Sequence, residues 1–476
     1  MFARILQRCL VRSAASRCLV DPEQRSEPDN SSPMGNGGTK LFSKEMSLLT
    51  YDEVVSLSAD EMLAIQEKGL QWTVRHAYAN SPFYRRKMDE AGVAPEDIKT
   101  IEDITKLPMT TPEDLRDNYP LGITAVPEKE IVRIHASSGT TGKKKVLPYT
   151  KKDVEDWAEM FSRCFRLAGL TPEDRIQVMV GYGLWTAGAG FQAGIEKFGA
   201  MAVPVGPGQT DLQLELMLDL QVTAFCATSS YALFIGEEVE RRGLKPRLKL
   251  KAGIIGSERW SDRMRRRIEE LLGVETFDIP GMTELYGPGT GLDCQAHEGI
   301  HYWSDYFLFE VVEPATGRPL PPGETGELVA TTLCKEAAPM IRYRTRDLTR
   351  LLPGRCSCGR SFLRTDRFLG RTDDMVKVRG VNIFPGQIDH FIGQFNALDS
   401  EYQLIITKEP AGKDILLLRV EHKPDFTGDL NELASLIRNR CTELIGVTPA
   451  VELVEYRSLP RTERKTKRIF DKREEL

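Results

Sequence analysis

Residues 135–149 read H-A-S-S-G-T-T-G-K-K-K-V-L-P-Y, a run rich in small, hydroxyl-bearing and cationic side chains. Gly139 and Gly142 allow backbone conformations that a side chain would block. Successive N–H groups can then point into one concavity and hold phosphate oxygens. The polar side chains of the run are Ser137, Ser138, Thr140, Thr141, Lys143, Lys144 and Lys145. Because Val132 and Ile134 are typical of a strand that ends just before it, the run predicts a phosphate-binding loop on a fixed scaffold.

Two other interpretations of this loop are a solvated linker and a Walker A loop. A Walker A loop begins with glycine and ends in Gly-Lys followed by a hydroxyl residue, whereas Ser137 holds the first of these positions and Lys144 the last. The form S-S-G-T-T-G-K followed by Y-T instead resembles the phosphate loop of adenylate-forming enzymes, the acyl-CoA synthetase and luciferase-like superfamily. It is most similar to the phenylacetate–CoA ligase branch, and the resemblance covers about residues 48–476.

The size and charge of the chain limit the possible classes of protein. Its 476 residues are enough for two or more domains. With 64 basic and 69 acidic residues the net charge is −5, so we expect neither a nucleic-acid nor a membrane partner. Nine scattered cysteines favour reduced thiols over a disulfide framework. We expect a monomer or a homodimer.

The N-terminal extension differs from the rest of the chain. Its first 20 residues carry arginines and no acid, and they resemble a mitochondrial presequence. The alternative is an extended, poorly ordered start, with Met34 or Met46 as other start sites. We therefore set residues 1–45 apart from the folded domains and expect a cytoplasmic protein, with a mitochondrial location as the alternative.

Strand and helix patterns alternate through the middle of the chain. A capping box at Ser58 and Glu61 opens a long helix. Further on, short apolar strands and amphipathic helices are expected in turn at residues 176–180, 200–205, 212–220, 223–228, 252–256 and 263–272. Such alternation predicts an α/β architecture, with parallel-rich sheets and crossover helices, in a large domain over residues 46–370.

The pattern changes after residue 370. The strands and the helix expected there lie at residues 403–406, 415–420, 430–444 and 451–456. They predict a small α+β domain over residues 371–476. The resemblance implies that this domain is a mobile lid over a large AMP-binding domain.

The run F-D-I-P-G-M-T-E that ends at Glu284 resembles the adenine and metal motif of the superfamily. The resemblance implies that Asp278 and Thr283 contact the nucleotide, Thr283 at the α-phosphate. It also implies that Glu284 holds Mg²⁺, a cation that prefers carboxylate oxygen. Pro280 departs from the aromatic residue that many relatives place against adenine. The alternative is a strand-to-loop turn in which Glu284 is a surface carboxylate.

Two further runs match the superfamily in order along the chain. The run Y-R-T-R-D that ends at Asp347 resembles a motif whose acid accepts the ribose hydroxyls; an edge strand of alternating charge is the alternative. The run G-R-T-D-D-M-V-K-V-R-G over residues 370–380 resembles the hinge of the family. This match implies a pivot at Asp373, nucleotide contact from Arg371 and passage of the pantetheine arm of CoA beside Gly380. A surface turn is the alternative.

A basic run near the C-terminus resembles the catalytic lysine segment of the family. Lys465 falls on the catalytic lysine, while Arg464 replaces the glycine that usually precedes it. Lys467 is a rival for the role, and a basic tail is the alternative interpretation. A mobile cation suits adenylation, because negative charge builds up on the carboxylate and the α-phosphate.

Three thiols and an imidazole form a possible metal set. Cys294, His301, Cys356 and Cys358 can make a tetrahedral structural zinc site. His297 is a rival ligand, and unpaired reduced thiols are the alternative.

The run Y-G-L-W-T-A-G-A-G over residues 182–190 resembles the acyl-pocket segment of the branch. Tyr182 and Trp185 suit a flat apolar ring, and core packing is the alternative. The resemblance implies a ligase that uses ATP, Mg²⁺ and coenzyme A to activate an aromatic carboxylic acid, and hence a role in phenylacetate catabolism. An arylacetate such as phenylacetate is the leading substrate, before indoleacetate or a benzoate. An adenylating enzyme with another acceptor, such as a carrier protein or a deazaflavin-type cofactor, and a non-catalytic nucleotide-binding protein remain alternatives.

Overall fold

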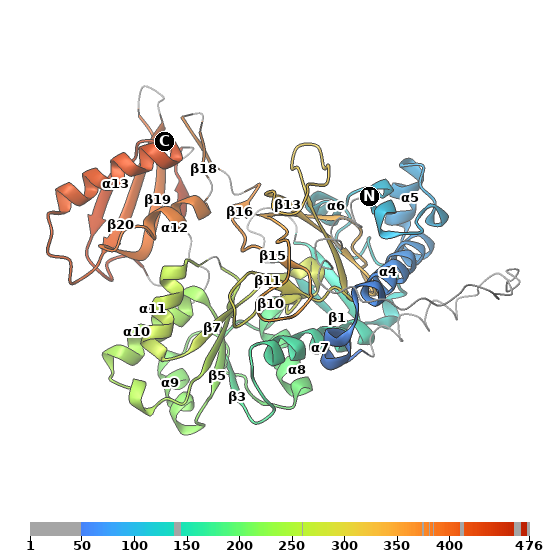
Figure 1. Ribbon diagram of the computed structural model, residues 1–476, viewed down its shortest axis with the longest axis horizontal. Coiled ribbons are helices and arrows are strands. Elements are labelled where there is room, and N and C mark those ends of the chain that lie inside the picture. Colours follow the sequence, from blue (N-terminus) through green and yellow to red (C-terminus); the bar gives the residue numbers. More distant parts are fainter. Residues whose placement is uncertain are drawn as a thin grey trace, which may run out of the picture.

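The computed structural model describes the chain over residues 49–137, 144–258, 260–373, 376–379, 381–383, 385–409, 414–460 and 468–473. The extension 1–45 lies outside these ranges. So do eight predicted site residues, namely Ser138, Gly139, Thr140, Thr141, Gly142, Lys143, Gly380 and Lys465. Figure 1 shows a large domain and, on one side of it, the small C-terminal domain that carries the label α13.

Four helices open the described chain, namely α3 (Tyr51–Ser56), α4 (Ala59–Asn80), α5 (Pro82–Glu90) and α6 (Pro112–Asp117). Helix α4 begins at the predicted capping box. The Ser58 hydroxyl accepts a hydrogen bond from the Glu61 N–H at 3.2 Å, and Glu61 Oε2 accepts one from the Ser58 N–H at 2.8 Å. Over the described ranges, no helix has both the length and the apolar character that a membrane crossing requires.

Five parallel strands form the centre of the large domain. In sheet order they are β4 (Met201–Val203), β3 (Arg175–Val178), β5 (Ala224–Thr228), β6 (Ala252–Gly256) and β7 (Glu275–Ile279). The helices that accompany them are α7 (Lys151–Leu167), α8 (Ala187–Phe198), α9 (Thr210–Asp219), α10 (Ser229–Arg241) and α11 (Asp262–Leu272). Every residue of β5 and β6 is buried, as in a parallel sheet covered on both faces. The predicted α/β architecture is therefore confirmed.

Antiparallel strands complete the large domain. A hairpin of β1 (Ile131–Ala136) and β2 (Val146–Thr150) flanks the predicted phosphate loop. A four-stranded sheet has the order β12 (Phe307–Val312), β13 (Gly326–Thr332), β14 (Tyr343–Thr349) and β16 (Gly370–Arg371). The smaller strands are β8 (Gly281–Met282), β9 (Gly287–Pro288), β10 (Gly291–Asp293), β11 (Ile300–Tyr302) and β15 (Arg364–Thr365). Because β14 lies between β13 and β16, the edge-strand interpretation of the run ending at Asp347 was wrong.

The small domain has its own sheet and core. Its elements are β17 (Val376–Val378), β18 (Val381–Ile383), α12 (Pro385–Ile392), β19 (Leu398–Lys408), β20 (Asp414–His422), α13 (Leu430–Ile445), β21 (Ala450–Val454) and β22 (Ile469–Asp471). Strands β19 and β20 are antiparallel, while β22 and β21 join the two sides in parallel. This sheet, with both antiparallel and parallel pairs, and the two helices α12 and α13 confirm the α+β character of this domain. Its predicted boundary, between residues 370 and 371, falls within β16.

The two domains meet along helices α10 and α11 (Figure 1). The Tyr456 hydroxyl donates a hydrogen bond to Glu237 of α10 at 2.9 Å, and Arg457 forms an ion pair with the same carboxylate at 3.2 Å. Arg263 of α11 donates to the carbonyl of Phe395 at 2.8 Å. These polar contacts hold the small domain in one orientation.

Candidate active site

The motif residues gather beyond the carboxyl ends of the parallel strands. Residues 182–190 follow β3, and the short 3₁₀ turn Thr283–Leu285 follows β7. The β1–β2 hairpin brings the end of the phosphate loop to this place, since Tyr149 of β2 donates hydrogen bonds to the carbonyls of Thr283, at 3.3 Å, and Tyr286, at 2.8 Å. Open α/β sheets commonly bind ligands at this edge.

Glu284 is a buried carboxylate, so the surface-residue interpretation was wrong. Its Oε1 contacts Lys145 Nζ in an ion pair and accepts a hydrogen bond from the Tyr343 hydroxyl at 2.8 Å. Burial opposes ionisation, but the Lys145 cation and the hydrogen bonds outweigh it and bring the pKa of Glu284 below its usual value. The site therefore holds an ionised acid beside the phosphate loop.

The contact between Lys145 and Glu284 was not predicted from the sequence. The run was expected to supply charge through three consecutive lysines, but only Lys143 was named as a nucleotide-binding residue. Ser137 lies at the start of the same loop, and its N–H donates to the Lys145 carbonyl at 3.1 Å. The buried Ser137 hydroxyl has no hydrogen-bond partner among the described residues, which leaves it able to bind a ligand.

Asp347, Arg371 and Asp373 form one ionic chain. Arg371 Nη1 contacts Asp347 Oδ1 at 3.1 Å, and its Nε and Nη2 donate to the two oxygens of Asp373 at 2.8 and 3.0 Å. Burial raises the pKa of Asp347 to about 6, although the Arg371 charge opposes this effect. The structure thus brings together the predicted ribose ligand, the predicted nucleotide arginine and the predicted hinge residue.

The remaining candidates for nucleotide binding and for the acyl pocket are Asp278, Tyr182 and Trp185. They are less closely linked to the residues described above. Asp278 of β7 faces Arg367 across 3.8 Å, and burial raises its pKa. Tyr182 is 38% exposed, and its ring covers Gly188, where a Cβ would come within 2.8 Å of it. Trp185 is half-buried. Tyr182 is therefore accessible, whereas Trp185 packs against the hydrophobic core.

The four predicted metal ligands come together from three segments. The ligand atoms of Cys294, His301, Cys356 and Cys358 all lie within 4.8 Å of one another. Cys294 Sγ is 3.6 Å from Cys356 Sγ, and Cys358 Sγ is 3.5 Å from His301 Nε2. Burial lowers the pKa of His301 to about 4, so its imidazole is neutral, as a metal ligand must be.

His297, the rival ligand, is engaged elsewhere. Its Nδ1 lies 2.9 Å from Asp293 and 2.7 Å from Arg265, away from the thiols. The group that gathers is therefore the one that includes His301.

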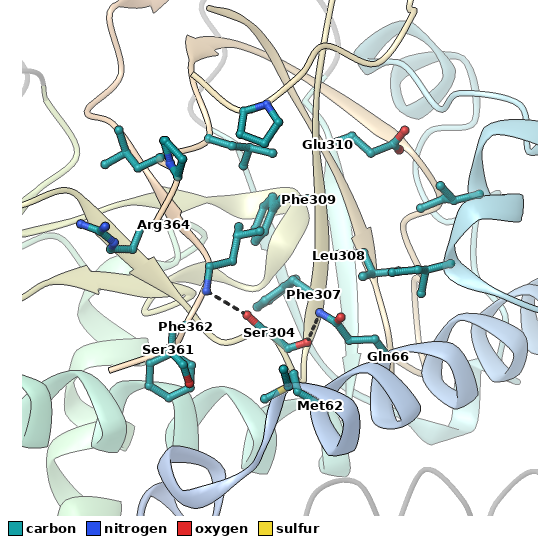
Figure 2. Close-up of a pocket in the computed structure, with 18 of the residues that line it drawn as sticks. Met62, Gln66, Ser304, Phe307, Leu308, Phe309, Glu310, Ser361, Phe362 and Arg364 are labelled. Carbon is teal, nitrogen blue, oxygen red and sulfur yellow. Dashed lines mark hydrogen bonds between the residues drawn. The ribbon is translucent and has the colours of Figure 1, made fainter. Parts of the chain in front are cut away.

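A separate cavity of about 760 Å³ lies between α4, β12 and the segment that leads to β15. Figure 2 shows its apolar wall, with Met62, Phe307 and Phe309, and the hydrogen bond from Gln66 to the Ser304 carbonyl, which is 2.9 Å long. None of the predicted site residues lines this cavity. It therefore belongs to a different part of the large domain.

Comparison with known families agrees with this geometry. The model of the AMP-binding enzyme family matches residues 58–333, and the model of the AMP-binding enzyme C-terminal domain matches residues 380–473. The chain belongs to the AMP-binding enzymes. Both the adenylate-forming superfamily and the α/β-plus-lid fold that the sequence predicted are thereby confirmed.

Within this family the chain falls in the phenylacetate–CoA ligase branch. It is 44% identical over 429 residues to the phenylacetate–coenzyme A ligase of Escherichia coli, with 89% of this chain and 97% of that protein covered. The protein of the same name from Thermus thermophilus is 39% identical, with coverage of 90% and 100%.

Among solved structures, 2-hydroxyisobutyryl-CoA ligase in the postadenylation state with 2-HIB-AMP is similar, with 31% identity and a TM-score of 0.80. The match covers 88% of this chain and 91% of that one. The same ligase with 2-HIB-AMP and CoA in the thioesterification state matches with a TM-score of only 0.66, over 89% and 92% of the chains. The domain orientation of this AMP-binding enzyme is thus closer to the postadenylation state.

Proposed function

We propose that this protein is an ATP-dependent arylacetate–CoA ligase that works in two steps. The carboxylate of the acid attacks the α-phosphate of ATP, pyrophosphate leaves, and an acyl-adenylate forms. The thiol of CoA then attacks the acyl carbon, and AMP leaves with the electron pair of the broken bond. The observation that carries this proposal is the buried, ionised Glu284, paired with Lys145 beside the phosphate loop in a chain 44% identical to a phenylacetate–coenzyme A ligase.

In the first step the residues of the large domain would stabilise growing negative charge. Ser137 offers a hydroxyl without a partner among the described residues, and Lys145 offers a cation next to the phosphate loop. Glu284 fits a magnesium ligand, because its carboxylate is ionised, buried and already next to one cation. Bound there, magnesium would offset the charge of the phosphates. Preorganised charges of this kind lower the barrier most when water is excluded.

In the second step the lid would turn about Asp373. Lys465 would lie over the phosphates during adenylation, and Gly380 would lie beside the pantetheine arm afterwards, as the resemblance to the superfamily implies. The ionic chain from Asp347 through Arg371 to Asp373 joins the nucleotide site to the hinge and supports this alternation. A few hinge residues can absorb such a rotation.

The acid would bind beside Tyr182 and Trp185, whose rings suit an aromatic substrate. Phenylacetate is the leading candidate, in line with the name of the relatives, and indoleacetate or a benzoate comes next. The direct test is to screen aryl acids for AMP release that depends on CoA. Phenylacetate should give the highest kcat/KM. If none of the aryl acids supports AMP release that depends on CoA, the proposal is refuted.

The cysteine–histidine group fits a structural zinc ion. Tetrahedral zinc with bonds of about 2.3 Å to sulfur and about 2.0 Å to nitrogen separates its ligand atoms by roughly 3.5–3.8 Å. Two of the observed separations, 3.6 and 3.5 Å, match these values, and all four ligand atoms lie within 4.8 Å of one another. Cys294, His301, Cys356 and Cys358 would hold the ion and fasten the β10–β11 hairpin to the segment before β15.

The location and the oligomeric state stay predictions. We favour a cytoplasmic monomer or homodimer, and the bacterial relatives lend no support to the mitochondrial alternative.

A further inference from the structure

Lys335 is a buried cation that lies outside all the sequence motifs. It follows β13, and its side chain has no exposed surface. Its Nζ lies 4.1 Å from the ring centroid of Tyr149 and 4.1 Å from that of Tyr286. Over the part of the chain that the structure describes, no hydrogen-bond acceptor reaches this Nζ. Burying a charge without such a partner is costly, so its presence between two rings calls for a specific role.

The backbone around Lys335 is tied to the start of helix α7. The Asp153 carboxylate accepts hydrogen bonds from the N–H groups of Glu336, at 2.8 Å, and Ala337, at 2.9 Å. It also accepts one from the N–H of Thr150, the N-cap of α7, at 3.0 Å. The Thr150 hydroxyl donates to the Glu336 side chain at 2.9 Å. These bonds fix the segment from which Lys335 projects between the rings.

Lys335 keeps its charge at neutral pH. Burial lowers its pKa to about 8, while the negative charges of Asp153 and Glu284 favour the protonated form. An ammonium group over the face of a tyrosine is attracted by the negative face of the ring, and the attraction grows when water is excluded. One cation that faces two rings therefore draws both toward itself.

The two rings belong to the two halves of the nucleotide site. Tyr149 stands on β2, at the end of the phosphate-loop hairpin, and Tyr286 directly follows the turn with Thr283 and Glu284. We propose that Lys335 is a positioning residue: its ammonium group clamps Tyr149 to Tyr286 and so holds Thr283 and Glu284 against the β1–β2 hairpin during adenylation. This inference rests on the proposed ligase function.

The test compares neutral and charged substitutions on the full-length enzyme. Lys335→Met keeps most of the length but removes the charge. We expect its melting temperature to stay at or above that of the wild type, because a buried charge is lost. ATP–pyrophosphate exchange should fall, and the magnesium concentration for half-maximal exchange should rise about tenfold, a factor on the scale of a desolvated cation–π contact. Lys335→Arg, which retains a cation, should recover part of the loss.

Lys152→Met is the matched control. Lys152 is also a buried lysine, but it pairs with Asp156 rather than with a ring. Its replacement should lower stability and leave the magnesium requirement unchanged.

Three results would overturn the inference. One is a Lys335→Met enzyme with the wild-type exchange rate and magnesium requirement. Another is a loss that merely follows the fraction of folded protein. If Lys335→Met does not fold, Tyr149→Leu removes one of the two rings that the ammonium group faces, and an unchanged magnesium requirement there would be equally decisive. If the wild-type enzyme shows no ATP–pyrophosphate exchange with any aryl acid, the proposed function is refuted, and this inference is refuted with it.

Discussion

A carboxylate in the position of Glu284 is ionised only because a cation and a hydroxyl accompany it into the protein. Burial alone raises the pKa of an acid, and here Lys145 and Tyr343 reverse the effect. Asp347 shows the opposite balance, because the effect of burial on its pKa outweighs the effect of the Arg371 charge, and the pKa rises. The two acids therefore ionise over different pH ranges.

For Glu284 we expect the change to glutamine to damage adenylation selectively. Glu284→Gln should slow ATP–pyrophosphate exchange by about 10² or more, the scale of a lost charge stabiliser. It should spare CoA transfer from supplied acyl-adenylate. Glu310→Gln is a control, because Glu310 pairs with Arg342 in another part of the domain and should not alter the exchange. Equal losses in both half-reactions of Glu284→Gln would contradict its assigned role.

For Asp347 we expect a pH-dependent cost to stability. Its folded-state pKa, about 6, lies above the usual value, so the native state holds the extra proton between about pH 4 and 6, and stability falls as the pH rises through that range. Asp347→Asn should therefore raise the free energy of unfolding by about 2–3 kcal/mol above pH 6.5, with little difference below pH 4. Urea unfolding of both proteins across this pH range measures the difference in the free energy of unfolding. Asp373→Asn, at an exposed acid, is the control. A pH-independent difference would refute the assignment.

The residue types of the site could be predicted from the sequence, but most of their partners could not. Motif spacing indicated Glu284, Asp347 and Arg371 because each falls at a characteristic place in a run. No spacing indicates that Lys145 meets Glu284 across 139 positions, or that Lys335 lies between two tyrosines. Those contacts arise when separate strands meet at one sheet edge, and alternation alone does not specify their register.

At the level of the elements, the four-ligand group links the β10–β11 hairpin to the segment before β15. Strand β11 pairs with β15 through two residue pairs, and a metal bound by the four ligands would add a further cross-link. The alternation of strands and helices predicted the parallel sheet, because its inner strands β5 and β6 are short, fully buried and largely apolar. It did not predict that β14 is an inner strand, since Arg344 and Arg346 project from a strand whose alternate residues are buried.

We expect about one zinc ion per chain of purified protein, as a four-ligand site requires. Cys358→Ser should remove the metal and lower the melting temperature, while the activity per folded molecule stays nearly the same. Cys226→Ser changes a buried thiol outside the group and should keep the zinc. Metal analysis that finds no zinc in protein prepared in reducing buffer would end this proposal.

At the scale of the whole molecule, the small domain is held on α10 and α11 by Tyr456, Arg457 and Arg263. Its orientation is nearer to the postadenylation state of a solved relative than to the thioesterification state. The polar nature of these contacts suits a surface that must separate in each cycle. The sequence predicted two domains and a hinge, but the contact surface is formed by side chains on distant elements.

Removing this contact should favour the other lid orientation. Arg457→Ala breaks the ion pair with Glu237, so we expect the two domains to separate more readily. A pair of fluorophores on the two domains should report a changed mean distance in the absence of ligands. Arg419→Ala breaks an ion pair within the small domain and is the control. An identical distance in wild type and Arg457→Ala would show that the contact does not hold the lid.

In the proposed mechanism one lid serves two half-reactions in turn, and ATP–pyrophosphate exchange measured beside single-turnover CoA transfer from supplied acyl-adenylate tests this alternation. Lys465→Ala should cut exchange by about 10² and leave transfer nearly intact. Asp373→Pro, with φ restricted to about −65°, should spare exchange and impair transfer. Asp373→Ala, which leaves the hinge free to rotate, should transfer faster than the proline variant. If Lys465→Ala and Asp373→Pro instead lose both half-reactions in proportion, the lid does not alternate and the account is contradicted.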